Sequence, residues 1–268
     1  ACDGQSDELE KISLLTSSTL CALLCFYNVS KETPLIINME NGRKAKFTES
    51  IFEWQNPVFG KPSSIDVVLI GTFVDKPEQK VVYFVESKFS EYFIVGPDHP
   101  SKKYLGDKEV SKSLYTEECF KKIGLKLQLD LPKKYKGKVY PNTFTIGPGD
   151  DQYAQGVSQM ITHYVGVNNF LSGKKKHNLG KYLPLPNDAE VYLGTIIFQI
   201  KSEAYDKYIK LAKKTAEVLS DDLFAKRKKN LVDERFVRVL YPRIYQNIFK
   251  GDNLKVLTKK TRIYYGFK

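Results

Sequence analysis

The sequence is poor in the residues from which many small metal and disulfide sites are built. It has three histidines and four cysteines in 268 residues. The cysteines form no CxxC pair and the histidines show no metal-ligand spacing, so neither a zinc site nor a disulfide framework is expected. There is also no GK[ST] phosphate loop, and no GxGxxG follows a predicted strand. The common nucleotide-binding motifs are therefore excluded.

Long uninterrupted apolar runs are absent too. The most apolar stretch, Ile12 to Val29, contains several hydroxyl residues and is preceded mainly by acidic residues. It is a poor signal peptide and a poor membrane span. Cys21 and Cys25 lie one helical turn apart within it, and we expect them to be buried thiols. A reducing cytoplasm is the expected compartment, with no membrane partner.

Acidic residues are outnumbered. Lys and Arg total 42 against 31 Asp and Glu, which gives a net charge of +11. This excess favours a polyanionic partner, with nucleic acid as the leading candidate, although many basic proteins are merely soluble. Three lysine clusters are either solvated faces or phosphate contacts with a strong salt dependence: Lys133 to Lys138, Lys174 to Lys176 and Lys226 to Lys229.

Length and composition predict a single domain. Hydrophobic residues make up 42% of the chain, and single cores grow to roughly 250 to 300 residues. We expect one domain over residues 1–268, with a basic helical C-terminal extension from about residue 202. Its predicted class is α/β, with a central mixed sheet flanked by helices.

Apolar patterns place the main elements. Strands are predicted at Leu35 to Asn38, Ile65 to Thr72, Lys80 to Phe89 and Glu190 to Ile200. Helices are predicted at Glu8 to Tyr27, after Gly149, at Ser202 to Leu219 and around Glu234 to Phe249. The segment Phe47 to Trp54 fits either a helix or a strand.

Acidic residues interrupt two of these strands. Asp66 lies in the first strand of a predicted antiparallel hairpin, and Glu86 and Lys88 end the second. Side chains alternate along a strand, so Glu86 and Lys88 point the same way. If the bend is centred near Lys76, Asp66 lies opposite Glu86. Two such carboxylates repel unless a cation joins them, and Mg²⁺ binds to one or two carboxylates together with phosphate oxygens.

This arrangement resembles the PD-(D/E)xK nuclease superfamily, which has the restriction-endonuclease-like fold. Asp66 is followed after nineteen residues by Glu86-Ser87-Lys88, although Ile65 stands where the usual motif has proline. The stretches "FEWQNPVFGKPSSIDVVLIG", "VESKFSEYF" and "QGVSQMITHYVG" look like a bacterial branch with an ESKFxE signature. The likeness covers roughly residues 12 to 30, 47 to 95 and 150 to 200.

The resemblance implies a role for each matching residue. Asp66 and Glu86 would be metal ligands, the carbonyl of Ser87 would be a third, and Lys88 would act on the attacking water. An upstream helix would supply a further acid, Glu53 or as second choice Glu49. A glutamine on a helix beside the site would be Gln159, with Gln155 as a further candidate.

The implied activity is hydrolysis of phosphodiesters, with metal-activated water attacking phosphorus in line and no covalent enzyme intermediate. Mg²⁺ is the expected cofactor, with Mn²⁺ as a substitute, and double-stranded DNA the expected substrate, cut by an endonuclease of restriction or defence type. A homodimer would suit double-strand cleavage.

Alternatives stay open at this point. A strand that ends in E-x-K often carries only a surface ion pair. Glu53 fits a helix-surface acid equally well, His163 fits a structural polar residue, and Glu91 fits a simple ion-pair partner. The rival function is a non-catalytic protein of the same fold that binds nucleic acid or another partner. DNA and RNA are not distinguished, nor are sequence specificity and methylation dependence.

Overall fold

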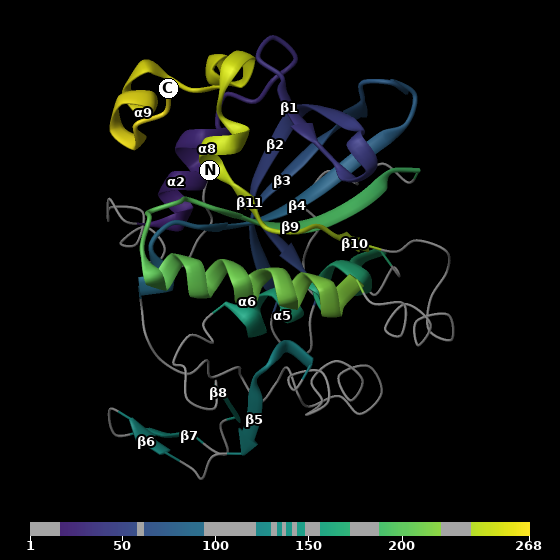
Figure 1. Cartoon of the computed structure of the whole chain (residues 1–268). Helices are drawn as coiled ribbons and strands as arrows, with labels where there is room; N and C mark the ends of the chain where they lie inside the picture. The colour runs from purple at the N-terminus through teal and green to yellow at the C-terminus, as the bar shows by residue number, and fades with distance from the viewer. Residues whose placement is uncertain are drawn as a thin grey trace.

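The computed structural model describes residues 17–57, 62–93, 122–129, 133–135, 138–140, 144–147, 156–171, 188–220 and 237–268. Its main feature is a seven-stranded sheet of order β1-β2-β3-β4-β9-β10, in which β11 also pairs with β9 (Figure 1). The strands are β1 (Leu35–Asn38), β2 (Lys44–Asn56), β3 (Ser63–Phe73), β4 (Lys80–Lys88), β9 (Glu190–Ile197), β10 (Val237–Val239) and β11 (Arg243–Ile244).

The sheet is mixed, as predicted. Neighbours from β1 to β4 run antiparallel, whereas β4 pairs with β9 in parallel, and β10 and β11 are parallel to β9. Helices cover both faces (Figure 1). One face packs against α5 (Val157–Leu171) and α6 (Glu203–Ser220). The other packs against α2 (Ser18–Phe26), α8 (Tyr245–Ile248) and α9 (Lys259–Tyr265). The α/β class with a helix-flanked mixed sheet is therefore confirmed.

Residues outside the large sheet form two small antiparallel ribbons. One pairs β5 (Lys126–Leu129) with β8 (Phe144–Gly147), and the other pairs β6 (Lys133–Tyr135) with β7 (Lys138–Tyr140). Short 3₁₀ turns complete the described elements: η1 (Glu40–Gly42), η2 (Glu91–Phe93) and η4 (Gly251–Val256). Within the described part of the chain, no helix is both long and apolar enough to span a membrane.

Strand β4 lies in the middle of the sheet and is buried on both faces. Val81, Tyr83 and Val85 pack toward α2, and Val82 and Phe84 pack toward α5 and α6. A strand covered on both sides reads as a continuous apolar run, because no position faces water. Polar residues at its end therefore enter a largely dry environment.

The predicted register of the hairpin is confirmed. Val67 pairs with Val85 and Thr72 pairs with Lys80, so the pairing is symmetric about Lys76. On its other side β3 runs close to β2: a Cβ at Gly71 would lie 2.0 Å from the carbonyl oxygen of Lys46. Only glycine fits at this close approach of the two paired strands. It lies beside a bulge between Phe47 and Glu49.

Local signals also set the helix ends. The Ser17 side chain accepts a hydrogen bond from the Leu20 N–H, which caps α2 at its start. Thr258 caps α9 in the same way, and Gly266 ends that helix in the left-handed conformation. Gly42, at φ +74°, closes the turn between β1 and β2, where an Asn-Gly pair suits positive φ.

The structure corrects one predicted element and decides the type of another. The helix expected around Glu234 to Phe249 is wrong: Val237–Val239 and Arg243–Ile244 are strands beside β9, and only Tyr245–Ile248 is helical. The region after residue 202 is therefore not simply a helical extension, because it contributes two strands to the main sheet. The ambiguous segment Phe47 to Trp54 lies within strand β2.

Other predictions agree with the structure. The helix predicted at Ser202 to Leu219 is α6, which buries Tyr205 and Tyr208 and exposes Lys210, Lys213 and Lys214. Cys21 and Cys25 are buried free thiols. Several predicted features lie outside the described residues: the start of the first helix, Gln155, and the lysine clusters at 174–176 and 226–229.

Candidate active site

Asp66, Glu86 and Lys88 form the centre of the site. They lie at the open end of the β3–β4 hairpin, away from its turn. Glu86 and Lys88 are 1% and 7% exposed, and the Lys88 Nζ donates to Glu86 Oε1 at 2.7 Å. The backbone N–H of Ser87 donates to Asp66 Oδ2 at 2.7 Å. The sequence prediction that these residues meet on one edge of a hairpin is thus confirmed as geometry.

Helix α5 adds two side chains to this group. Gln159 accepts a hydrogen bond from the Lys88 Nζ through its Oε1 at 2.8 Å. One turn later, His163 Nε2 lies 2.8 Å from Glu86 Oε2, although the two groups are not aligned as a hydrogen bond. The predicted position of Gln159 beside the site is confirmed, and the structure adds His163, which sequence reasoning treated as structural.

Glu53, the first candidate for the upstream acid, lies beside Asp66 but on a strand. The register of β2 against β3 runs from Phe52–Val67 to Trp54–Ile65, which leaves Glu53 opposite Asp66. Its charge contributes to the raised pKa of the Asp66 carboxyl. The expectation of a helix is therefore wrong.

Glu49 is a poorer candidate than Glu53. It pairs with Ile70, four residues along β3 from Asp66, which corresponds to roughly 13 Å of strand. The register thus separates the two acids that the sequence left as alternatives.

The backbone of β2 departs from regular strand geometry at Glu53. Glu53 has φ +53° and is the single non-glycine residue with positive φ among the described residues. Phe52 and Trp54 pack on opposite faces, as do Val67 and Ile65, so the usual alternation is broken here in both strands. Strained conformations of this kind cost about 1–3 kcal/mol and cluster at functional sites.

The pKa values of the two central carboxyl groups shift in opposite directions. Asp66 keeps some accessible surface, yet its carboxyl group is enclosed by protein. Burial first, and then the charge of Glu86, raises the pKa of Asp66 well above its usual range. Burial would also raise the pKa of Glu86, but the charges of Lys88 and His163 outweigh it and lower that pKa to about 2.

Lys88 is held in its charged form. Burial by itself would lower the pKa of Lys88, but the surrounding charges, with Glu86 first and Glu91 next, raise it above its usual value. In this arrangement the ammonium group donates protons in hydrogen bonds and does not accept one. Lys88 is therefore suited to orienting a water molecule and to stabilising negative charge on a phosphate.

Residues around the centre support it. Glu91 Oε2 accepts from the N–H groups of Phe89 and Ser90, which ends β4 and starts η2. The Ser87 hydroxyl donates to the Ser18 carbonyl at 3.0 Å and lies 2.8 Å from the Tyr245 hydroxyl. Tyr208 of α6 contributes to the raised pKa of Lys88. The sequence gives no functional signal for Tyr208, because the residue belongs to the apolar stripe of α6.

Oxygen atoms at this edge fit a hard divalent cation. In a strand the N–H and C=O of one residue point to the same side. Because the Ser87 N–H points to Asp66, the Ser87 carbonyl faces that side too. Within the described ranges no three His, Cys, Asp or Glu side chains are grouped as metal ligands. Mg²⁺, however, is commonly bound by one or two carboxylates and several waters, and a buried Glu86 Oε2 with no hydrogen bond fits this chemistry.

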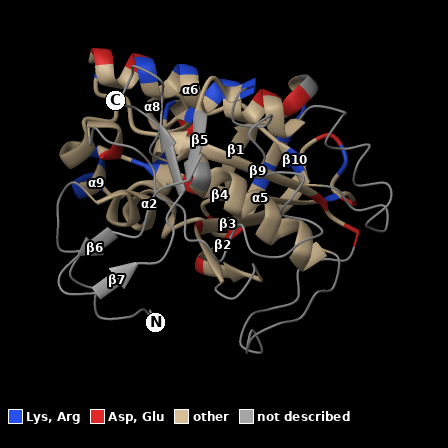
Figure 2. Cartoon of the chain, turned by 90° about the horizontal axis from the view of Figure 1, so that it is seen from below, with Lys and Arg blue, Asp and Glu red and all other residues tan. Residues whose placement is uncertain are grey.

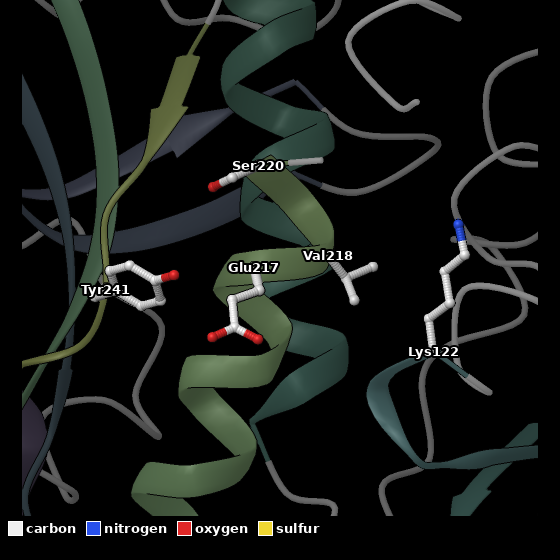
Figure 3. Close-up of a pocket in the computed structure, with 5 residues that line it drawn as sticks. All are labelled: Lys122, Glu217, Val218, Ser220 and Tyr241. Atoms are coloured by element: carbon white, nitrogen blue, oxygen red, sulfur yellow. The ribbon is translucent and has the colours of Figure 1, made fainter. Parts of the chain in front are cut away.

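A cavity lies in another part of the described structure, away from these residues. It has a volume of about 370 Å³ and is lined by Lys122, Glu217, Val218, Ser220 and Tyr241 (Figure 3). None of these residues belongs to the group around Asp66. We place the candidate active site at the end of the hairpin, because there the carboxyl groups, the buried lysine and the shifted pKa values coincide.

Comparison with family models, curated proteins and solved structures gives no match to this chain.

Proposed function

We propose that this protein is a metal-dependent nuclease that hydrolyses phosphodiester bonds, with double-stranded DNA as its first expected substrate. The observation that carries the proposal is the meeting of Asp66, Glu86, Lys88 and Gln159, from three separate elements, in one largely buried group. The net charge of +11 supports a polyanionic substrate. A restriction-endonuclease-like fold is part of this proposal.

Each residue has a defined task in the proposed reaction. Asp66, Glu86 and the Ser87 carbonyl would hold Mg²⁺, or Mn²⁺ in its place, with Glu53 beside them. When bound, the cation supplies positive charge toward a phosphate and lowers the pKa of water. Lys88 orients the attacking water and offsets charge on the phosphate, and Gln159 fixes the Lys88 ammonium.

Helix α6 carries a basic surface that would contact the substrate backbone. Lys210, Lys213 and Lys214 are exposed in the middle of α6, whereas acidic residues lie toward its two ends (Figure 2). The same helix contributes Tyr208 next to Lys88. Phosphate contacts from these lysines would make substrate binding weaken as salt concentration rises.

A non-catalytic binding protein is the second candidate. It is favoured by one observation: both oxygens of Glu86 already have close neighbours, Lys88 and His163, as in a purely structural ion pair. Such a protein would bind nucleic acid in a salt-sensitive manner with no requirement for a divalent ion.

The direct test incubates the protein with supercoiled plasmid, linear duplex, single-stranded DNA and RNA, each with Mg²⁺, Mn²⁺ or EDTA. We expect cleavage that requires the metal and is lost in Lys88→Met, in which methionine keeps the apolar stem. Lys80→Met is the matched control, because Lys80 is an exposed lysine at the opposite end of β4. Cleavage by the Lys88→Met protein at the wild-type rate would refute the nuclease, and salt-sensitive binding without any cleavage would favour the second candidate.

Glu53 and Glu49 provide a matched pair for a second prediction. Glu53→Gln should lower cleavage in Mg²⁺ by about 10–100-fold, because it removes a charge next to the proposed ligands. Glu49→Gln should cleave like the wild type. Glu53→Gly should lose activity while keeping or gaining thermal stability, because glycine adopts positive φ without strain. Equal activity of the Glu53→Gln and Glu49→Gln proteins would rule out the assigned role of Glu53.

A further inference from the structure

A chain of three side chains leads from the start of β3 to the candidate ligand Glu86. The Ser63 hydroxyl is hydrogen-bonded to His163 Nδ1, and the opposite ring nitrogen, Nε2, lies 2.8 Å from Glu86 Oε2. All three residues are at most 4% exposed. Buried polar groups are costly unless they are paired, and the His163–Glu86 pair is a close charge contact without an aligned hydrogen bond.

Ser63 and Glu86 lie at opposite nitrogens of the His163 ring. Nε2 carries a proton that faces Glu86 both in the imidazolium and in the neutral tautomer whose Nδ1 accepts from the Ser63 hydroxyl. Glu86 is thereby approached from two sides, by Lys88 at Oε1 and by His163 at Oε2. A carboxylate offers about four acceptor directions, so these two contacts orient the group and leave others for a cation.

Helix spacing ties this chain to the rest of the site. His163 follows Gln159 by one turn, so both residues project from the same face of α5. Gln159 holds Lys88 and His163 holds Glu86. One helix face therefore orients both members of the buried ion pair.

We propose that His163, oriented by Ser63, is a positioning residue that holds the Glu86 carboxylate in the orientation required to bind a divalent cation. This inference rests on the proposed function, because it assigns Glu86 to the cation. It adds a residue pair that the likeness to PD-(D/E)xK nucleases did not supply.

A merely structural histidine would show different behaviour. It would contribute to folding stability, and its loss would leave cation affinity unchanged in the folded protein. A positioning residue changes cation affinity, because ligands that lose an orienting partner typically bind metal about 10–100-fold more weakly.

The test measures Mn²⁺ binding to the full chain by isothermal titration calorimetry, with thermal unfolding recorded for each metal-free protein. His163→Phe should weaken Mn²⁺ binding by about 10–100-fold. His163→Gln should recover part of the loss, because the glutamine amide nitrogen can occupy the place of Nε2. Ser63→Ala should give a smaller loss, and it keeps the test informative if His163→Phe does not fold.

Asn169→Leu is the matched control. Asn169 is also buried on α5, but its side chain donates to the Pro57 carbonyl and not to Glu86. This variant should lose stability and retain Mn²⁺ affinity. The proposal is overturned if His163→Phe and His163→Gln bind Mn²⁺ as tightly as the wild type. Failure of the wild type itself to bind Mn²⁺ would instead reject the proposed metal-dependent function, and the inference with it.

Discussion

The Asp66→Asn protein should lose cleavage and nevertheless unfold at a higher temperature than the wild type when divalent ions are absent. Cleavage should fall by about 10³-fold or more, because removing a ligand forfeits several kcal/mol of charge stabilisation. The gain in stability follows from the raised pKa of Asp66, whose causes are burial and the neighbouring Glu86. An amide at this position carries no charge to desolvate.

Asp66 should make the folded protein less stable at neutral pH than at acidic pH. Because the folded protein holds the Asp66 proton more tightly than the unfolded chain, this group lowers stability as pH rises above its ordinary pKa of 3.8. The stability advantage of Asp66→Asn should therefore be present at pH 7 and should shrink as the pH is lowered toward 4.

Divalent ions should make the wild type more stable than the Asp66→Asn protein. Excess Mg²⁺ should raise the unfolding temperature of the wild type, since a ligand at 100 times its Kd adds about 2.7 kcal/mol, and should leave Asp66→Asn nearly unchanged. Asp75→Asn is the matched control, because Asp75 is a half-exposed acid in the β3–β4 turn. A metal-free Asp66→Asn protein less stable than the wild type would contradict this account of the site.

The second large effect concerns stability. Glu86→Ala should lower the free energy of unfolding by about 3–5 kcal/mol, because it leaves the buried Lys88 ammonium without its main counter-charge. Lys88→Met combined with Glu86→Leu should be considerably less destabilised than Glu86→Ala, because no unpaired charge remains. Urea denaturation of the single and double variants measures both values.

A surface pair provides the comparison for this experiment. Glu203 and Lys207 are joined at 2.9 Å, with the Glu203 side chain 81% exposed. Glu203→Ala should cost less than about 1 kcal/mol, because exposed pairs gain little over hydration. Similar costs for Glu86→Ala and Glu203→Ala would show that the pair at the site is effectively solvated.

The pH dependence of the Glu86 contribution is opposite to that of Asp66. The pKa of Glu86 falls from 4.5 to about 2 on folding, because the charges of Lys88 and His163 outweigh the effect of burial. Its stabilising contribution is therefore fully present above about pH 5 and is lost as pH falls toward 2. The difference in unfolding free energy between wild type and Glu86→Ala should shrink across that range.

The hairpin at the centre of the site could be predicted from local sequence. Val, Ile, Phe and Tyr dominate both strands, and the short polar turn between them leaves little freedom for the pairing. Once the pairing was symmetric about Lys76, the period of two placed Glu86 and Lys88 on one face of β4, beside the part of β3 that carries Asp66. The local sequence and regular strand geometry were sufficient to predict how β3 and β4 pair.

The C-terminal segment shows where local pattern fails. Val237–Val239 looks compatible with a helix by sequence, yet it forms a strand because β9 presents an unpaired edge beside it. A three-residue strand has almost no intrinsic stability, so its conformation depends on the neighbour with which it pairs. That neighbour is more than forty positions away in the chain.

By itself, therefore, the sequence determined the α/β class, the β3–β4 register and the meeting of Asp66, Glu86 and Lys88, because these depend on short-range periodicity. Only the tertiary structure decided that Glu53 rather than Glu49 lies beside Asp66, and that His163 contacts Glu86. Both outcomes depend on how β2 and α5 pack against the hairpin. Packing between elements is set by the shape of the whole core, and no local pattern specifies it.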